Sequence, residues 1–333
     1  MLLDIRNLQV RLPDQGRKLH AVRGLDITVE AGETLCLVGE SGCGKSMTAL
    51  ALMGLLPPRA ERSADRLRFG DTDLDRLSER AMSGLRGRRM SMIFQEPMTA
   101  LNPVFTIGDQ LRAVYRRHTG AGSAAAQTRA IEVLESVGLT NAALRLSQYP
   151  HQLSGGLRQR VLIAMALICE PELMICDEPT TALDVTTQAQ ILHILKQAQE
   201  ARNMGMIFIT HDLGVVARIA DRVAVMYAGH VVEEGTREAV LRKPAHPYTR
   251  GLIASVPRPQ GAVPGSTRLA SIAGNVPAFH HEDARCPFLS RCTSKLAICA
   301  EAPPVVRTAV SGQKVACHLQ LASSTGAGET LSA

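Results

Sequence analysis

Tryptophan is absent from the 333-residue sequence, only 3% of the residues are aromatic, and no aromatic residue precedes Phe69. Long hydrophobic runs are missing too: the longest, VLIAMALIC at residues 161–169, ends at Glu170. A helix needs about 20 apolar residues to cross a bilayer. We therefore expect a soluble or peripheral protein rather than one that spans a membrane.

A secretory signal and a strong charge of one sign are also lacking. The first residues, MLLDIRNLQV, include Asp4, and no long apolar run follows them. The net charge of +6 is a mild excess, more typical of a solvated surface than of a nucleic-acid partner. Without an export signal, disulfides are not expected. Four of the eight cysteines lie in apolar patterns and are expected to be buried thiols: Cys36, Cys43, Cys169 and Cys176.

Hydrophobic residues make up 45% of the sequence, which is enough for a sizeable core. The chain length suggests roughly two domains. Strands are expected at 2–12, 25–33, 34–40, 90–95, 172–177 and 205–210, and a hairpin at 224–235. Helices are expected at 45–56, 158–169 and 187–202. Residues 106–156 are expected to be mostly helical, and residues 59–89 to form surface structure. Apolar strands that alternate with helices predict an α/β fold with a mainly parallel sheet covered on both faces.

The clearest motif is GESGCGKS, which matches G-x-x-x-x-G-K-[ST] between an apolar strand and a helix. Its glycines let backbone N–H groups surround a phosphate, and the helix adds its positive N-terminus. Lys45 is expected to reach phosphate oxygens, and Ser46 to ligate Mg²⁺. The predicted ATP-binding loop consists of Gly39, Glu40, Ser41, Gly42, Cys43, Gly44, Lys45 and Ser46.

Two adjacent acids complete a hydrolytic site. The buried strand LMICD delivers Asp177 at its carboxyl end, where ligands sit in open α/β sheets. Asp177 suits the Mg²⁺ shell, and Glu178 is placed to orient or deprotonate an attacking water. By themselves these features do not separate a kinase, a helicase or a transporter motor.

A further set of motifs distinguishes between these three classes of protein. LSGGLRQR at residues 153–160 resembles the signature of ABC-type ATPases, Gln95 resembles the Q-loop glutamine, TALD at 181–184 the D-loop, and His211 the switch histidine. Five motifs in the right order cover residues 1 to about 240. The resemblance implies an ABC-type P-loop fold: a mainly parallel sheet with helices, an antiparallel β subdomain, a helical signature subdomain, and here a small C-terminal extension.

The resemblance also implies roles for single residues. Two such domains dimerise head to tail, so Ser154, Gly155 and Gly156 would bind the γ-phosphate of the partner's nucleotide. His211 would contact the γ-phosphate and hold the water with Glu178. Gln95 would sense Mg²⁺ and water and signal to a membrane partner.

Two departures from the family pattern are present. Leu157 replaces the usual signature glutamine, which removes at most one polar contact. Most relatives stack adenine on an aromatic residue near the second strand, and none is present there. His20 could stack instead, or it could be an ordinary surface residue.

The sequence changes character after about residue 242. KPAHPYTRGLIASVP at 243–257, with HPYT as its core, and IAGNVP at 272–277 resemble the C-terminal extension of oligopeptide/dipeptide importer ATPases. Cys286, Cys292, Cys299 and Cys317 follow with spacing C-x5-C-x6-C-x17-C. Four thiolates fit a 4Fe-4S cluster or a structural Zn²⁺. The wide spacing favours the cluster, unligated thiols remain an alternative, and His318 could replace a ligand.

We therefore expect the ATP-hydrolysing subunit of a bacterial peptide importer, peripheral on the cytoplasmic face of the inner membrane. Its partners would be a second, related but different ABC ATPase subunit, two permease subunits and a substrate-binding protein, with no nucleic acid. The expected domains are 1–240, 241–322 and a disordered tail at 323–333. A nickel or glycoside importer, a soluble ABC ATPase, and a regulatory module built around the cysteines remain alternatives.

Overall fold

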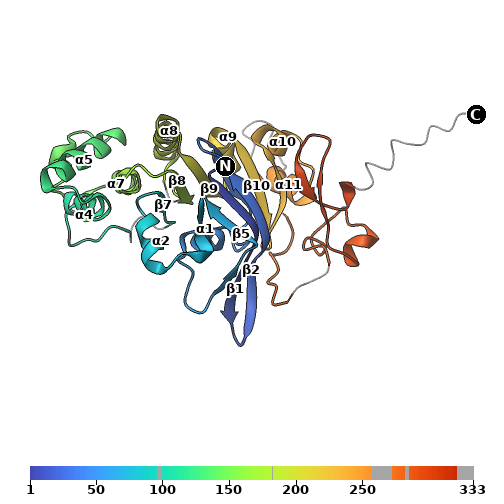
Figure 1. The fold of residues 1–333 in the computed structure, drawn as a ribbon. Helices are drawn as coiled ribbons and strands as arrows, with labels where there is room; N and C mark the ends of the chain where they lie inside the picture. The colour runs from blue at the N-terminus through green and yellow to red at the C-terminus, as the bar shows by residue number, and fades with distance from the viewer. Residues whose placement is uncertain (96–99, 182, 257–271, 282–284, 321–333) are drawn as a thin grey trace, which may run out of the picture.

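The computed structural model of the chain describes residues 1–95, 100–181, 183–256, 272–281 and 285–320, so the expected tail at 323–333 lies outside the described residues. Figure 1 shows the helices α4, α5 and α7 at one end of the molecule and the C-terminal segments at the other, with the strands between them.

The larger sheet has eight strands in the order β12-β13-β11-β10-β3-β9-β8-β7. Their bounds are β12 Val306–Thr308, β13 Lys314–Ala316, β11 His230–Thr236, β10 Arg222–Tyr227, β3 Thr34–Val38, β9 Gly205–Thr210, β8 Leu173–Asp177 and β7 Met90–Ile93. The strands from β10 to β7 are parallel, and β11, β13 and β12 pair antiparallel. Because β3, β8 and β9 are buried at every residue, the predicted doubly covered parallel sheet is confirmed.

The smaller sheet is antiparallel, in the order β2-β1-β5-β6, with β4 also paired to β1. Its strands are β1 Leu3–Asp14, β2 Arg17–Val29, β4 Glu61–Ser63, β5 Arg66–Phe69 and β6 Thr72–Asp73, followed by η1 Leu74–Arg76 and α2 Glu79–Leu85. The expectation of surface structure over 59–89 is wrong in part. Leu67 and Phe69 enter the core while Arg66 and Arg68 stay exposed, the two-residue alternation of a half-buried strand.

The helices follow the predicted pattern, with corrected ends. They are α1 Lys45–Met53, α4 Ile107–Thr119, α5 Ser123–Ser136, α6 Ala142–Arg145, α7 Gly155–Leu167, α8 Val185–Arg202, α9 Leu213–Ile219, α10 Arg237–Arg242 and α11 Pro247–Ala254. Helix α1 ends three residues earlier than predicted because Gly54 adopts a left-handed conformation and donates its N–H to Ala51.

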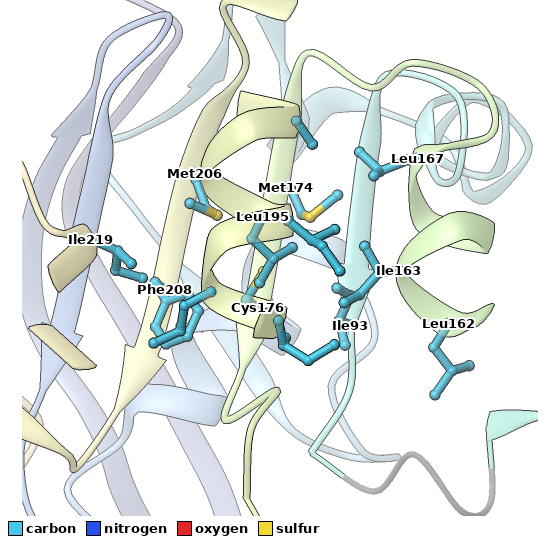
Figure 2. Packing of buried hydrophobic residues seen from close by; sticks show 14 of the residues in the cluster. Ile93, Leu162, Ile163, Leu167, Met174, Cys176, Leu195, Met206, Phe208 and Ile219 are labelled. Atoms are coloured by element: carbon cyan, nitrogen blue, oxygen red, sulfur yellow. The ribbon is translucent and has the colours of Figure 1, made fainter. Parts of the chain in front are cut away.

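The main core lies between the parallel sheet and its helices. Figure 2 shows Met174 and Cys176 of β8 and Met206 and Phe208 of β9 facing side chains from α7 and α8, such as Ile163 and Leu195. The buried thiols predicted at Cys36, Cys43 and Cys176 are confirmed, and burial raises the pKa of each. Cys169 is only partly buried.

The C-terminal region closes onto the larger sheet. Strand β13 pairs with β11 through Val315 opposite Glu233, and β12 pairs with β13, so residues after 300 extend the same sheet that holds the phosphate loop. This extension could not be expected from the sequence, since each strand has only three residues. Among the described residues, none of the helices has the length and apolar character needed to cross a membrane.

Candidate functional site

The phosphate loop connects the carboxyl end of β3 to the start of α1, as predicted. Gly44 precedes α1 at φ +106°, and Gly39 has φ +156°. A Cβ atom on Gly39 would collide with the carbonyl oxygen of Met226, and one on Gly44 with that of Ala21. Both positions therefore need glycine to keep the loop close to the neighbouring strands.

Lys45 lies folded against its own loop. The residue is 5% exposed, and Nζ donates to the carbonyl oxygens of Gly39 at 2.8 Å and Glu40 at 2.9 Å. The ammonium also contacts the sulfur of Cys43 at 3.7 Å. A buried cation next to inward-turned backbone is suited to a phosphate, because phosphate oxygens can replace these neutral acceptors.

Ser46 and Asp177 meet across the loop and strand β8. The Ser46 hydroxyl donates to Oδ1 of Asp177 at 3.1 Å. Burial raises the pKa of Asp177, and the Ser46 hydrogen bond opposes this. A hydroxyl and a carboxylate are hard oxygen ligands that fit Mg²⁺. A divalent cation would also offset the cost of burying this carboxylate.

Glu178 brings three predicted functional regions together. Its carboxylate lies 3.1 Å from Nδ1 of His211, accepts from the Thr181 hydroxyl at 3.0 Å, and lies 3.5 Å from the amide nitrogen of Gln95. Glu178 also has φ +46°, a conformation that non-glycine residues rarely adopt and that often marks functional sites. The contact with Thr181 was not predicted, although its motif was.

The signature residues lie apart from this cluster. Ser154 caps α7 by accepting from the N–H of Leu157 at 3.4 Å, and Gly155 and Gly156 form the first turn. None of the three lines the cavity that contains the phosphate loop among the described residues. Leu157, at the usual glutamine position, packs against the main core, so it has a structural role.

The phosphate loop opens into a cavity of about 1190 Å³, which Gln95, Glu178 and His211 also line. Leu12, Leu19 and His20 of the antiparallel sheet form another side. The remaining lining comes from the C-terminal region, which sequence reasoning had not connected with the nucleotide: Leu252, Ser255, Val256, Gly274, Asn275, Val276, Pro277, Ala278 and Phe279.

Two C-terminal side chains hold Glu40 of the phosphate loop. Arg291, whose side chain is 4% exposed, contacts both carboxylate oxygens of Glu40 at 2.6 and 2.9 Å. The hydroxyl of Tyr248, in the HPYT motif, accepts the Glu40 N–H at 2.9 Å. His246 begins the motif and accepts the N–H of Tyr248 on Nδ1 at 3.0 Å. Burial lowers the pKa of His246 to about 3, so it is neutral.

The four tail cysteines occupy one neighbourhood. Cys286 donates its N–H to the carbonyl of Cys299 at 3.0 Å, and thiolates at Cys292, Cys299 and Cys317 would each raise the pKa of Cys286 electrostatically, in addition to the larger effect of burial. In the described part of the chain, no three His, Cys, Asp or Glu side chains are arranged to hold a metal ion. Nε2 of His318 lies 3.0 Å from the carbonyl oxygen of Ala302, which makes it a poor replacement ligand.

Comparison with known proteins gives two family matches. Residues 22–181 match the ABC transporter family, and residues 232–299 match the oligopeptide/dipeptide transporter C-terminal region. The chain is 48% identical to the dipeptide transport ATP-binding protein DppD of Bacillus subtilis (strain 168), covering 96% of this chain and 95% of that protein. It is 42% identical to DppD of Escherichia coli (strain K12), with 96% and 97% covered.

Solved structures give the same fold. The ATP-binding cassette MJ0796, determined as a dimer in a post-hydrolysis state with ADP and Pi, superimposes with a TM-score of 0.63 at 25% identity. The match covers 71% of this chain and 98% of the cassette, so this chain contains additional structure that the cassette lacks.

Proposed function

Because the chain belongs to the ABC transporter family of ATP-binding proteins, we propose that it hydrolyses ATP to drive the import of dipeptides or oligopeptides. One observation carries the cargo assignment: the 48% identity to a dipeptide transport ATP-binding protein extends through the C-terminal region. The arrangement of Lys45, Ser46, Asp177 and Glu178 supports the ATPase chemistry.

The residues of the site divide the work of hydrolysis. Lys45 leaves the carbonyls of Gly39 and Glu40 to bind phosphate oxygens. Ser46 and Asp177 would hold Mg²⁺, which would neutralise charge on the phosphates. Glu178 orients a water and accepts its proton as the water oxygen attacks the γ-phosphorus. The bond from the γ-phosphorus to the bridging oxygen then breaks, and ADP leaves.

His211 and Gln95 act through the same carboxylate. Their contacts with Glu178 keep it aimed at the water, and His211 contacts the γ-phosphate. Gln95 is also proposed to sense Mg²⁺ and water and to pass the closed state to the membrane partner.

The second half of each site comes from another chain. ABC cassettes dimerise, as MJ0796 does, and we propose that Ser154, Gly155 and Gly156 serve the partner's nucleotide. Their separation from this chain's own cavity supports that arrangement. The partner is proposed to be a related but different ATPase subunit. Mass analysis of the complex purified from its native cell would contradict this if two copies of this chain were found.

The complete importer requires further chains. We propose two permease subunits that this ATPase docks on from the cytoplasmic face of the membrane, and a substrate-binding protein on the far side. We propose two domains. Residues 1–240 form the ATPase domain, and residues 241–322 form the importer-specific extension.

For the extension we propose that Cys286, Cys292, Cys299 and Cys317 ligate a 4Fe-4S cluster, with Zn²⁺ as the second candidate. Four thiols close enough to interact electrostatically support this donor set, since both groups take four thiolates. Anaerobic purification followed by iron, sulfide and zinc assays, beside Cys292→Ser, tests it. About four iron and four sulfide per chain, lost in the variant, are expected, whereas zinc without sulfide identifies the second candidate.

The test of the function is transport by the assembled importer. Proteoliposomes containing both ATPases and the permeases, with the binding protein added, should hydrolyse ATP faster when dipeptide is supplied. Uptake of labelled dipeptide should disappear with Glu178→Gln. Stimulation by Ni²⁺ or a glycoside instead of dipeptide would identify the alternative importers. Full activity without permeases would indicate a soluble ABC ATPase.

A further inference from the structure

A short C-terminal segment forms one side of the nucleotide cavity. Residues Gly274–Phe279 line the cavity together with the phosphate loop, although more than 220 residues separate them in the sequence. Leu12 and Leu19, which pair with each other between β1 and β2, line the same cavity. The cavity therefore has a phosphate-binding end and a second, largely apolar part built from two distant regions.

This segment is fixed at both ends by described contacts. At its start, Arg291 donates to the carbonyl oxygens of Ile272 at 3.2 Å and Ala273 at 2.8 Å. At its end, Phe279 accepts the N–H of His20 at 2.8 Å, and Nε2 of His280 lies 2.7 Å from Oδ2 of Asp14. The same Arg291 binds Glu40, so one residue holds both the segment and the phosphate loop.

The segment supplies chemistry that the amino-terminal part of the cavity lacks. Among the described residues, Phe279 is the one Phe or Tyr that lines the cavity. The guanidinium of Arg23 lies 4.0 Å from the centre of its ring, which fixes the ring's position. Asn275 is exposed and lines the same cavity, and no described residue hydrogen-bonds to its side-chain amide.

We propose that Gly274–Phe279 is the base-binding surface for the nucleotide, and that Phe279 takes the place of the missing aromatic near the second strand. Phe279, Leu12 and Leu19 contact the faces of the purine, since a flat base binds best to aromatic and apolar surface. The Asn275 amide offers both a donor and an acceptor to the base edge. This inference rests on the nucleotide site proposed above and assigns to it the residues that recognise the base.

The test separates base recognition from phosphate binding. The full-length protein is titrated with a fluorescent ATP analogue, which is then displaced by ATP, GTP or inorganic tripolyphosphate. Phe279→Ala should weaken ATP binding about tenfold, the usual loss for one base stacked on an aromatic residue. Tripolyphosphate, which has no base, should bind Phe279→Ala within about twofold of the wild-type protein.

Four further variants complete the experiment. Phe279→Tyr should restore ATP affinity, and Phe105→Ala, at an exposed phenylalanine away from the cavity, should leave it unchanged. Asn275→Ala should bring the affinities for ATP and GTP closer together. Lys45→Ala should weaken ATP and tripolyphosphate together, and if it weakens neither, the nucleotide site itself is wrong.

Three results would overturn the base-binding assignment. They are an unchanged ATP affinity in Phe279→Ala, an equal loss for ATP and tripolyphosphate, and tighter ATP binding. The last result would show that the segment obstructs the cavity. Because Phe279→Ala could unfold the segment, the ratio of ATP to GTP affinity is measured independently in Asn275→Ala. The proposal requires this ratio to differ from that of the wild-type protein.

Discussion

The phosphate loop is held from two sides, and the two sides use different interactions. On the core side, β3 pairs along its length with β9, and four of its residues also pair with β10. On the C-terminal side, two side chains, Arg291 and Tyr248, bind a single residue, Glu40. Backbone pairing survives most side-chain changes, whereas a single-residue contact can be removed by one substitution. The C-terminal region should therefore be where nucleotide affinity is easiest to alter without damaging the fold.

The largest expected effect lies on the core side, where the chemistry occurs. Glu178→Gln keeps the size of the side chain but cannot accept a proton, so ATP hydrolysis should fall by about 100-fold or more. Phosphate release by the assembled complex measures this, and ATP binding should persist. Glu132→Gln, at an exposed glutamate on α5, is the matched control. Equal loss of binding and hydrolysis would contradict the role given to Glu178.

The next effect is on the C-terminal side. Arg291→Ala leaves the Glu40 carboxylate without its guanidinium partner, so stability should fall by about 2 kcal/mol and ATP should bind more weakly. Arg291→Lys should recover only part of the loss, because lysine cannot contact both carboxylate oxygens in the same way. Denaturant unfolding of Arg291→Ala, Glu40→Ala and the double variant gives the interaction free energy between the two side chains. Strictly additive losses would show that the two residues are not coupled.

A pH effect should also come from the C-terminal side. His246 has a pKa of about 3 in the folded chain because it is buried, against about 6.5 when unfolded. Between these values the unfolded chain binds a proton that the folded chain does not. Stability is therefore full above pH 6.5 and falls on acidification towards pH 3, by at most about 1.4 kcal/mol per pH unit.

The variant that checks this is His246→Asn, since asparagine can still accept the Tyr248 N–H as a helix cap. Denaturant unfolding at several pH values gives the slope of the unfolding free energy against pH. In the variant, this slope should correspond to the uptake of about one proton fewer on unfolding. His230, whose pKa burial lowers to about 4, contributes in the same direction and remains in the variant. An unchanged slope would mean that His246 does not control this acid sensitivity.

The smallest effect isolates one hydrogen bond. Tyr248→Phe keeps the buried ring, which packs 4.7 Å from the ring of Tyr227, and removes only the hydroxyl that accepts the Glu40 N–H. Stability should fall by about 1 kcal/mol, and ATP affinity should fall slightly. Tyr115→Phe on α4, where the side chain is only partly buried, is the control. A loss as large as that of Arg291→Ala would mean that Tyr248 has a further role.

The same comparison explains which parts were predictable from the sequence. Strand β8 was predictable because its continuous apolar run ends in two acids, and the ends of parallel strands share one edge of a sheet. Lys45 and Ser46 followed from a motif flanked by a strand and a helix. His211 carries little signal by itself and was found only through the order of the family motifs.

The C-terminal contacts could not be predicted in this way. Arg291 and Glu40 are 251 positions apart, and neither position has a neighbouring pattern that points to the other. Phe279 lies in a segment without helix or strand periodicity. Similarly, β5 was missed because two buried residues between arginines are too few to establish an alternating pattern. Prediction failed where the structure depends on individual distant pairs instead of repeated local ones.

The pairing of β13 with β11 has a consequence for how the chain is made. During synthesis β11 leaves the ribosome well before β13, so its outer edge has no partner for that interval. Unpaired strand edges are sites where chains associate wrongly. In the finished molecule, β12 forms the outer edge, with only three residues, all of them exposed, and Arg307 at its centre. Strand β13 therefore covers the middle of this seven-residue edge, at Glu233 and Glu234, and the strand outside it is short and charged and offers little to a neighbouring chain.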